Sequence, residues 1–193
     1  MCASDLLYAS GWTLGQGILQ RANVKPGDHA LVWGLKSQPT RGQRTQGAID
    51  ALENGGLIVD YIEISAEVDK DAANGIPVIV GYLQANPNCR VVVTDHGNLT
   101  SAQQAYFESA GYGPDETYGA GFDLSPATVE SIKSGYTDLV LDQQPFLQGF
   151  LPVMQIYLTK KFGFSGLHID TGGGLIGPDN IDFIAPLAEK GIR

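Results

Sequence analysis

Short, continuously apolar segments alternate with helix-length segments along the first two-thirds of this chain. The apolar segments are rich in Val, Leu and Ile, which is typical of strands buried on both faces of a parallel sheet. Because parallel strands need long crossovers, the segments between them are expected to be helices. The alternation predicts an α/β fold, a doubly wound parallel sheet with helices on both faces. The expected strands are 29–34, 57–64, 90–94, 118–122 and 138–141, and the expected helices are 6–22, 44–52, 69–85, 101–110 and 126–134.

The last third of the chain has a different pattern, in which apolar residues recur at helical spacing. A helix with such a wide apolar face needs a second layer to pack against, and Pro152 is expected to kink it. The glycines at 172–174 lack the Lys-Ser/Thr pair of a phosphate-binding loop, so they favour a flexible hinge exit, followed by a short helix over 180–190. The residues of this apolar stripe are Phe146, Leu147, Phe150, Leu151, Met154, Tyr157 and Leu158.

The composition limits the class of partner. The 193 residues carry 21 acidic and 12 basic side chains, a net charge of −9, which argues against a nucleic-acid partner because phosphate neutralisation needs a basic face. No apolar run approaches the roughly 20 residues of a membrane span, and no charged-then-apolar leader typical of a signal peptide is visible. Cys2 and Cys89 make no disulfide framework, and Cys89 is expected to be a buried structural thiol.

Polar side chains follow three of the expected strands. Asp95 comes directly after 90–94, Asp123 after 118–122, and the pair Asp142-Gln143 after 138–141. Open α/β sheets hold small ligands at the carboxyl ends of their strands. Carboxylates accept hydrogen bonds and amides both donate and accept, which suits a polyhydroxylated ligand. The pattern therefore predicts a binding site and indicates no chemistry.

Several segments in this order and spacing resemble the second lobe of type I periplasmic sugar-binding proteins, the ribose- and galactose-binding class. The resemblance covers essentially the whole chain, although each segment alone is a weak signal. Its segments are Ala3-Ser4-Asp5 at a first hinge crossing, Gln38-Pro39-Thr40-Arg41 with Arg44, Thr94-Asp95-His96, Gly121-Phe122-Asp123, Asp142-Gln143-Gln144-Pro145 at a second crossing, and Ile169-Asp170-Thr171-Gly172 at a third.

The resemblance implies a solute-binding protein of an ABC importer that holds a sugar or polyol non-covalently between two lobes. It implies a transporter permease as partner, a periplasmic or lipid-anchored extracellular location for the full-length protein, and neither enzyme activity, cofactor nor metal. It also implies three parts: a second-lobe domain over 1–143, a helix over 144–165 that the family places in the first lobe, and a third crossing with the C-terminal segment over 166–193. The ligand-binding residues implied are Arg41, Arg44, Asp95, Asp123 and Gln143.

Four of these residues also have a purely structural alternative. Arg44 could be an exposed arginine at a helix start, although its rigid fork of donors favours ligand contact. Asp123 could cap the helix expected at 126–134, but Ser125 is better placed to do so. Asp95 could cap a turn before the helix at 101–110, and Gln143 could only tie hinge backbone together.

The sequence departs from the family pattern at two contact positions. Val68 stands where the family often has an aromatic ring that stacks on the sugar, and Thr94 stands where it often has Asn. Both departures favour a flexible polyol, or a sugar that presents hydroxyls. The histidines His29, His96 and His168 share no metal-ligand spacing, and only His96 lies near the expected site.

The resemblance also implies that the first lobe is absent from this sequence, which would leave the apolar stripe without its partner. We expect such a stripe either to fold back onto its own domain or to pair with a second copy. Two rival functions remain open: the effector-binding core of a LacI-type transcription regulator, and an enzyme on a doubly wound sheet. The first lacks an upstream helix-turn-helix segment here, and the second lacks a recognisable catalytic constellation.

Overall fold

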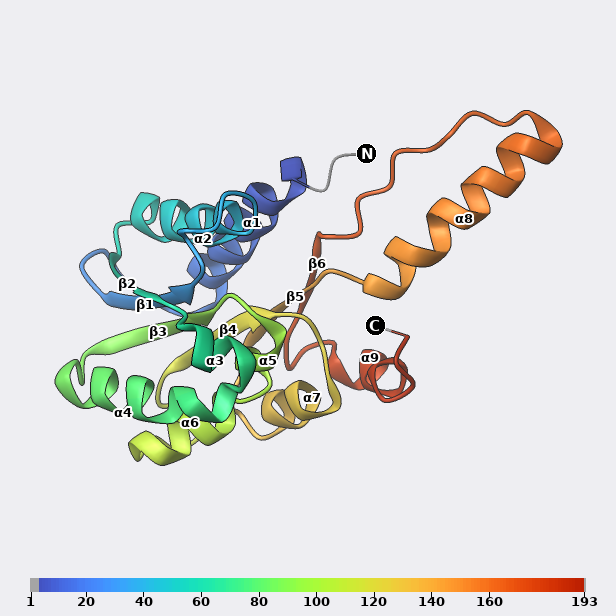
Figure 1. The fold of residues 1–193 in the computed structure, drawn as a ribbon. Helices are drawn as coiled ribbons and strands as arrows, with labels where there is room; N and C mark the ends of the chain where they lie inside the picture. Colours follow the sequence, from blue (N-terminus) through green and yellow to red (C-terminus); the bar gives the residue numbers. More distant parts are fainter. Residues whose placement is uncertain (1–3, 193) are drawn as a thin grey trace.

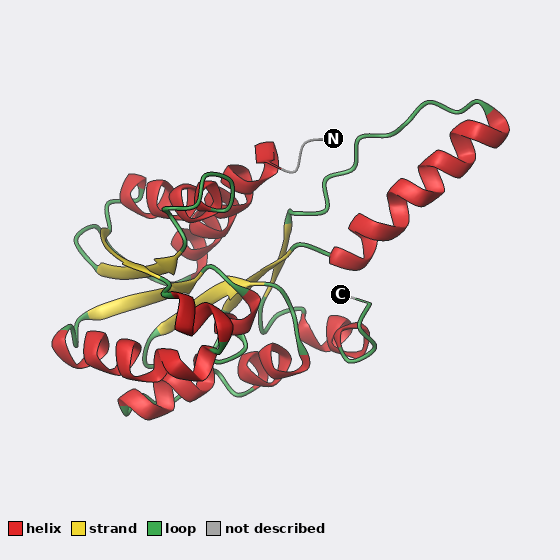
Figure 2. Cartoon of the chain, in the orientation of Figure 1, coloured by secondary structure: helices red, strands yellow, loops and turns green. Residues whose placement is uncertain are grey.

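A computed structural model describes residues 4–192, with side chains from Leu7 onward. Within this range the chain folds around one six-stranded sheet in the order β2-β1-β3-β4-β5-β6 (Figures 1 and 2). Of the expected first hinge crossing, Ala3 lies outside the described residues. The strands are β1 (His29–Gly34), β2 (Ile58–Glu63), β3 (Cys89–Thr94), β4 (Tyr118–Phe122), β5 (Leu139–Asp142) and β6 (Gly174–Ile176).

Strands β1 to β5 are parallel, as the sequence predicts, but β6 is antiparallel to β5. The predicted doubly wound parallel sheet is confirmed, and it carries one antiparallel strand at this edge that the sequence did not predict. After β5 the chain leaves the sheet at the carboxyl end and returns to that same end, where Gly174 pairs with Asp142. A strand entered from that end must run in the opposite direction. Gly174 thus begins a strand, so the glycine cluster is only in part the expected hinge exit.

Helices cover both faces of the sheet (Figure 1). Helices α1 and α2 pack on one face, where Leu14, Ile18 and Leu52 bury against strand residues. The other face carries α4 and α6 with Trp33 and Phe107 in its core. The helices are α1 (Ser4–Arg21), α2 (Gly42–Asn54), α3 (Ala66–Lys70), α4 (Ile76–Ala85), α5 (Gly97–Thr100), α6 (Gln103–Ala110), α7 (Pro126–Lys133), α8 (Pro145–Phe162) and α9 (Ile181–Ala188).

The expected single helix over 69–85 is instead α3, a 3-10 turn (Ala72–Gly75) and α4. The break has a local cause. The Asp71 carboxylate accepts from the backbone N–H of Ala73 at 3.0 Å and starts a new turn, and Pro77 then lies in the first turn of α4. Proline is favoured in a first helical turn because its missing N–H is not needed there.

Helices α1 and α2 lie unusually close together because glycines face each other at their crossing. A Cβ on Gly11 would lie 2.0 Å from the carbonyl oxygen of Arg44, and one on Gly47 would lie 2.2 Å from that of Tyr8. No larger residue fits at either position without separating the helices. This contact fixes the first turn of α2, and with it the backbone of Arg44.

Helix α8 projects away from the domain (Figure 1). None of its residues is buried, and Phe146, Phe150 and Tyr157 of the apolar stripe are 45–48% exposed. The expectation that the stripe folds back onto its own domain is therefore wrong, because no residue of α8 is buried against it. Pro152 lies inside this helix. No helix among residues 4–192 is long and apolar enough to cross a membrane.

Candidate functional site

Arg44 is the centre of a hydrogen-bonded cluster at the carboxyl ends of the strands. Only 5% of this arginine is exposed, although it lies in the first turn of α2. Its Nε donates to Asp95 Oδ1 at 2.5 Å, its Nη2 donates to the Asp95 carbonyl at 2.5 Å, and its Nη1 donates to Gln143 Oε1 at 2.8 Å. The alternative of an exposed arginine at a helix start is therefore excluded. Arg44 joins the end of β3 to the residue that follows β5.

Asp95 uses both carboxylate oxygens within the protein. Oδ1 accepts from Arg44, and Oδ2 accepts from the hydroxyl of Thr45. Only 1% of this residue is exposed. The carboxylate is directed at α2, so Asp95 holds the guanidinium of Arg44 in a fixed orientation.

The ring of Phe122 supports the same guanidinium from one side. The Arg44 Cζ atom lies 4.4 Å from the ring centroid, within the range of a cation–π contact. The sequence indicated Asp95 and Gln143 as polar residues at strand ends, but it predicted no role for Thr45 or for the ring of Phe122. Their roles depend on where α2 crosses the sheet, and that follows from the close approach of α1 and α2.

Asp123 lies at the end of β4 in a left-handed conformation, with φ of 66°. Its backbone N–H donates to the Leu141 carbonyl at 3.0 Å. Burial raises the pKa of its carboxyl above the usual range, and the nearby Asp142 and Asp95 add to this, whereas Arg44 and Arg41 oppose it. Gly97 leaves room for it, since a Cβ there would lie 3.1 Å from Asp123 Cβ.

Ser125 caps the start of α7, as the sequence predicts, and Asp123 does not. The Ser125 hydroxyl accepts from the backbone N–H of Thr128 at 3.1 Å. The Asp123 carboxylate is therefore not needed to begin that helix. It is near enough to Arg44 for that charge to lower its pKa.

Gln143 and Gln144 divide two tasks at the exit from β5. The Gln143 side chain accepts from Arg44, whereas the Gln144 amide donates to the Thr171 carbonyl at 3.2 Å and ties the two hinge segments together. The alternative role for Gln143, tying hinge backbone together, thus belongs to Gln144. The Gln148 amide in α8 donates to the Gln143 carbonyl at 2.8 Å, which fixes the start of that helix.

Arg41 is exposed at the start of α2, apart from the hydrogen-bonded cluster. The loop that carries it is held to β2: the Ser37 hydroxyl donates to Glu63 Oε1 at 2.5 Å, and the Lys36 N–H donates to the Tyr61 hydroxyl at 2.9 Å. Arg41 is close enough to Asp123 to oppose the rise in its pKa. Of the five predicted residues, three are directly hydrogen-bonded together, and Asp123 and Arg41 flank them.

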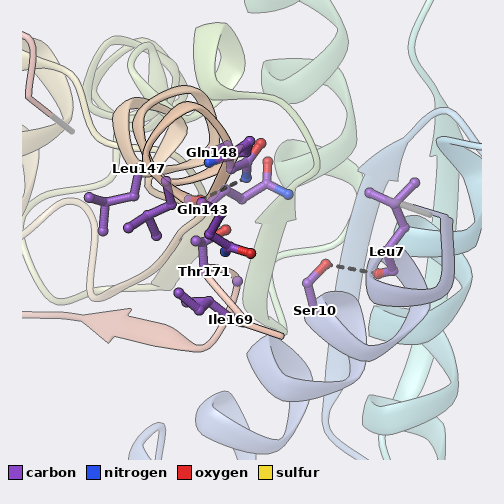
Figure 3. Close-up of a pocket in the computed structure, with 11 residues that line it drawn as sticks. Leu7, Ser10, Gln143, Leu147, Gln148, Ile169 and Thr171 are labelled. Atoms are coloured by element: carbon purple, nitrogen blue, oxygen red, sulfur yellow. Dashed lines mark hydrogen bonds between the residues drawn. The ribbon is translucent and has the colours of Figure 1, made fainter. Parts of the chain in front are cut away.

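A cavity of about 330 Å³ opens beside this cluster, between α1, α8 and the returning segment (Figure 3). Gln143 is the only predicted ligand residue in its wall. Polar amides and hydroxyls alternate with apolar side chains there, as in many small-molecule sites. Its lining residues are Leu7, Ser10, Gln143, Leu147, Gln148, Leu151, Pro152, Gln155, Ile169, Thr171 and Gly172.

Val68 and Thr94, the two residues that depart from the family pattern, both make contacts within the domain. Val68 is 3% exposed and packs in the core beneath α3. The Thr94 hydroxyl lies 3.0 Å from that of Thr100 and accepts from the Gln103 amide at 2.9 Å. Neither side chain is free to contact a ligand. Within residues 4–192, no group of three His, Cys, Asp or Glu residues is placed to hold a metal ion.

The sequence profile of the periplasmic binding protein domain matches residues 4–161. The chain belongs to the periplasmic binding protein family. Among curated relatives, the xylose/arabinose-binding protein XylF of Sulfolobus acidocaldarius is 30% identical over 184 residues, which is 91% of this chain and 44% of the relative. The chain therefore spans less than half the length of that periplasmic binding protein.

Solved structures show the same fold. A sugar-binding protein of a sugar ABC transporter from Bacillus halodurans superposes with a TM-score of 0.78 at 17% identity, covering 92% of this chain and 64% of that one. A carbohydrate transporter from Acidothermus cellulolyticus, solved with myo-inositol, has a TM-score of 0.75 at 18% identity, covering 97% and 62%. At such identities these periplasmic binding proteins establish the fold alone. The family consists of binding proteins rather than enzymes.

Proposed function

We propose that this chain is a sugar- or polyol-binding lobe of an ABC-transporter solute-binding protein. The observation that carries the proposal is the placement of Arg44, held by Asp95 and Gln143 at the carboxyl edge of the sheet, next to the Asp123 carboxyl. Ligands of open α/β sheets bind at this edge. The family and the xylose/arabinose-binding relative support the same ligand class.

The roles of the five residues follow from their donors and acceptors. Asp123 accepts from ligand hydroxyls, and Arg41 donates to them from the rim. Arg44 has five N–H groups, of which three bond to Asp95 and Gln143, so two remain for ligand oxygens. Asp95 and Gln143 act mainly by fixing the plane of that guanidinium. Charged groups make the stronger hydrogen bonds to hydroxyls.

We further propose that the opposite wall of the site belongs to a second lobe, since the chain spans only 44% of its curated relative. Tight small-ligand sites bury most of the ligand surface. One wall should therefore bind weakly, with a dissociation constant above about 1 mM. Saturable micromolar binding in a calorimetric titration would contradict this. The proposed partner of the whole protein is an ABC-transporter permease, and its proposed location is periplasmic or extracellular.

The function is tested by following amide and arginine Nε–H resonances while D-xylose, L-arabinose or myo-inositol is added at millimolar concentrations. We expect saturable shifts at Arg44, Asp123 and Gln143. Asp123→Asn should weaken the response. Asp115→Asn is the matched control, because Asp115 also has a positive φ, of 60°, and lies at the opposite end of the sheet. Equal effects of both variants, or shifts away from the strand ends, would refute the site.

A second copy of the chain is the other partner that we propose, through the apolar stripe of α8. Helix α8 has no buried residue, and large exposed apolar patches are uncommon on monomers. Sedimentation should then show a dimer, and Phe150→Glu should dissociate it. A monomer whose α8 amides exchange freely with solvent would exclude the dimer. That outcome would leave the sugar-binding proposal unaffected.

A further inference from the structure

His96 is a buried polar residue that the site described above does not use. It follows Asp95 at the end of β3 and is 5% exposed. Neither of its ring nitrogens has a hydrogen-bond partner among the described residues, and both are shielded from solvent. Leaving a buried polar group unpaired destabilises a folded protein, so such groups are rare. An unpaired imidazole beside a ligand site therefore needs an explanation.

A carboxylate lies close to His96 Nε2 but is too distant to form a hydrogen bond with it. Asp69 Oδ1, in α3, lies 3.8 Å from this nitrogen, beyond hydrogen-bonding distance. The Asp69 side chain is 43% exposed, whereas that of His96 is 6% exposed. Asp69 therefore forms the solvent side of the pair and can shift outward. Because His96 Nε2 is closed to solvent at this separation, an oxygen atom can bond to both groups only once Asp69 has moved outward.

Burial and the neighbouring charged groups set the protonation state of the His96 imidazole. Burial lowers the pKa of His96 below its usual range, and Arg41 and Arg44 of the α2 region act in the same direction, whereas Asp95 and Asp69 oppose it. The ring is therefore neutral at neutral pH, with one nitrogen that donates and one that accepts. The charges that act on the ring are of both signs, Arg41 and Arg44 against Asp95 and Asp69, so they favour a neutral polar group over an ion of either sign.

We propose that His96 and Asp69 form a subsite for one hydroxyl group of the bound sugar or polyol. The inference rests on the proposed function and extends its site toward α3. The hydroxyl donates its proton to the Asp69 carboxylate and accepts from the Nε2–H of His96. A hydroxyl can donate and accept at once, so one neutral group satisfies both partners. The subsite lies on the α3 side of Asp95, away from Gln143.

The three histidines of the chain supply the experiment with internal controls. His29 lies at the opposite end of the sheet, at the start of β1, and His168 is exposed in the segment after α8. With ¹⁵N-labelled imidazoles, titration with myo-inositol or D-xylose should shift the ring nitrogens of His96 alone. The Nε2–H tautomer should become the dominant form. A purely structural histidine would not change tautomer with sugar.

Two variants complete the test. His96→Phe retains an aromatic ring but removes both unpaired nitrogens. The variant should be at least as stable as the parent protein and should bind sugar about tenfold more weakly. His96→Gln, which retains a donor and an acceptor, should recover part of that loss. Unchanged affinity in His96→Phe, or an unmoved His96 signal while the Arg44 Nε–H shifts, would overturn the subsite and leave the proposed function standing. If neither signal moves, the proposed function itself fails.

Discussion

The Nε of Arg44 donates to Oδ1 of Asp95 across 2.5 Å, although the two residues are 51 positions apart in the sequence. Both are nearly inaccessible to solvent. An ion pair in such surroundings is costly to break from one side only, because the remaining charge stays buried without its partner. The pair therefore stabilises the fold as well as the site.

The first prediction concerns this pair. Asp95→Asn should lower the free energy of unfolding by about 3–5 kcal/mol, since the buried guanidinium loses its counter-charge. Urea unfolding monitored by circular dichroism measures the change. The exposed pair of Arg21 and Asp179, whose side chains are 37% and 62% accessible, provides the control. Asp179→Asn should cost less than about 1 kcal/mol, and equal losses in the two variants would contradict the role of burial.

The second prediction concerns the crossing of α1 and α2. Gly11→Ala should destabilise the protein by more than about 2 kcal/mol, because its Cβ would lie 2.0 Å from a backbone oxygen that cannot move without shifting α2. Gly81→Ala in α4 is the matched control, since no atom lies within 4 Å of its added Cβ. That variant should gain about 0.5–1 kcal/mol of stability from helix propensity. Thermal unfolding of the two variants distinguishes packing from propensity.

The third prediction is a pH dependence that arises at the amino end of the sheet. Burial raises the pKa of Asp138 to about 6, and Asp115 adds to this, whereas the Gly119 N–H opposes it. An unfolded Asp has a pKa of about 3.9, so the stabilisation is present below pH 4 and lost as the pH rises through about 6. Asp138→Asn should therefore gain stability relative to the parent between pH 4 and pH 7. Parallel pH profiles of the variant and the parent in urea unfolding would contradict it.

The fourth prediction concerns the link from Arg44 to the hinge. Gln143→Met preserves volume but removes the acceptor of the 2.8 Å bond from Nη1, which should cost about 1–3 kcal/mol. The Arg44 Nη resonances should also broaden as the guanidinium loses one anchor. Gln104→Met on α6 removes an exposed bond to Glu108 and a half-buried bond from Ser134, the residue after α7, but no buried charge depends on it. It should change stability by less than about 0.5 kcal/mol.

Strand positions could be predicted from the sequence because each buried strand is a short apolar run with its own turn signals. The residues after 90–94, 118–122 and 138–141 were predicted to meet because parallel strands present their carboxyl ends at one edge. What Arg44 does there was not predictable. Its partners are 51 and 99 positions away, and its burial depends on two glycines that let α1 and α2 approach.

Two other features, the direction of β6 and the unpaired state of His96, depend on contacts between distant segments and could not be predicted from local sequence. The direction of β6 depends on the end of the sheet to which the segment after α8 returns. The unpaired state of His96 depends on the 3.8 Å gap to Asp69, which belongs to a different helix. The break between α3 and α4 did have a local signal in Asp71 and Pro77, and it could have been found from capping chemistry.

The antiparallel pairing of β5 and β6 makes residues 143–173 the loop of a single long hairpin whose base is tied by Gln144 and Thr171. Helix α8 is thus an insertion that begins at the base of that hairpin loop and runs outward along it, with no buried residue of its own. Replacing the loop with a short turn would leave all six strands in register. The sequences of the sheet and of α8 can consequently vary independently. Packing in the core constrains the strands, whereas the surface that α8 binds constrains the helix.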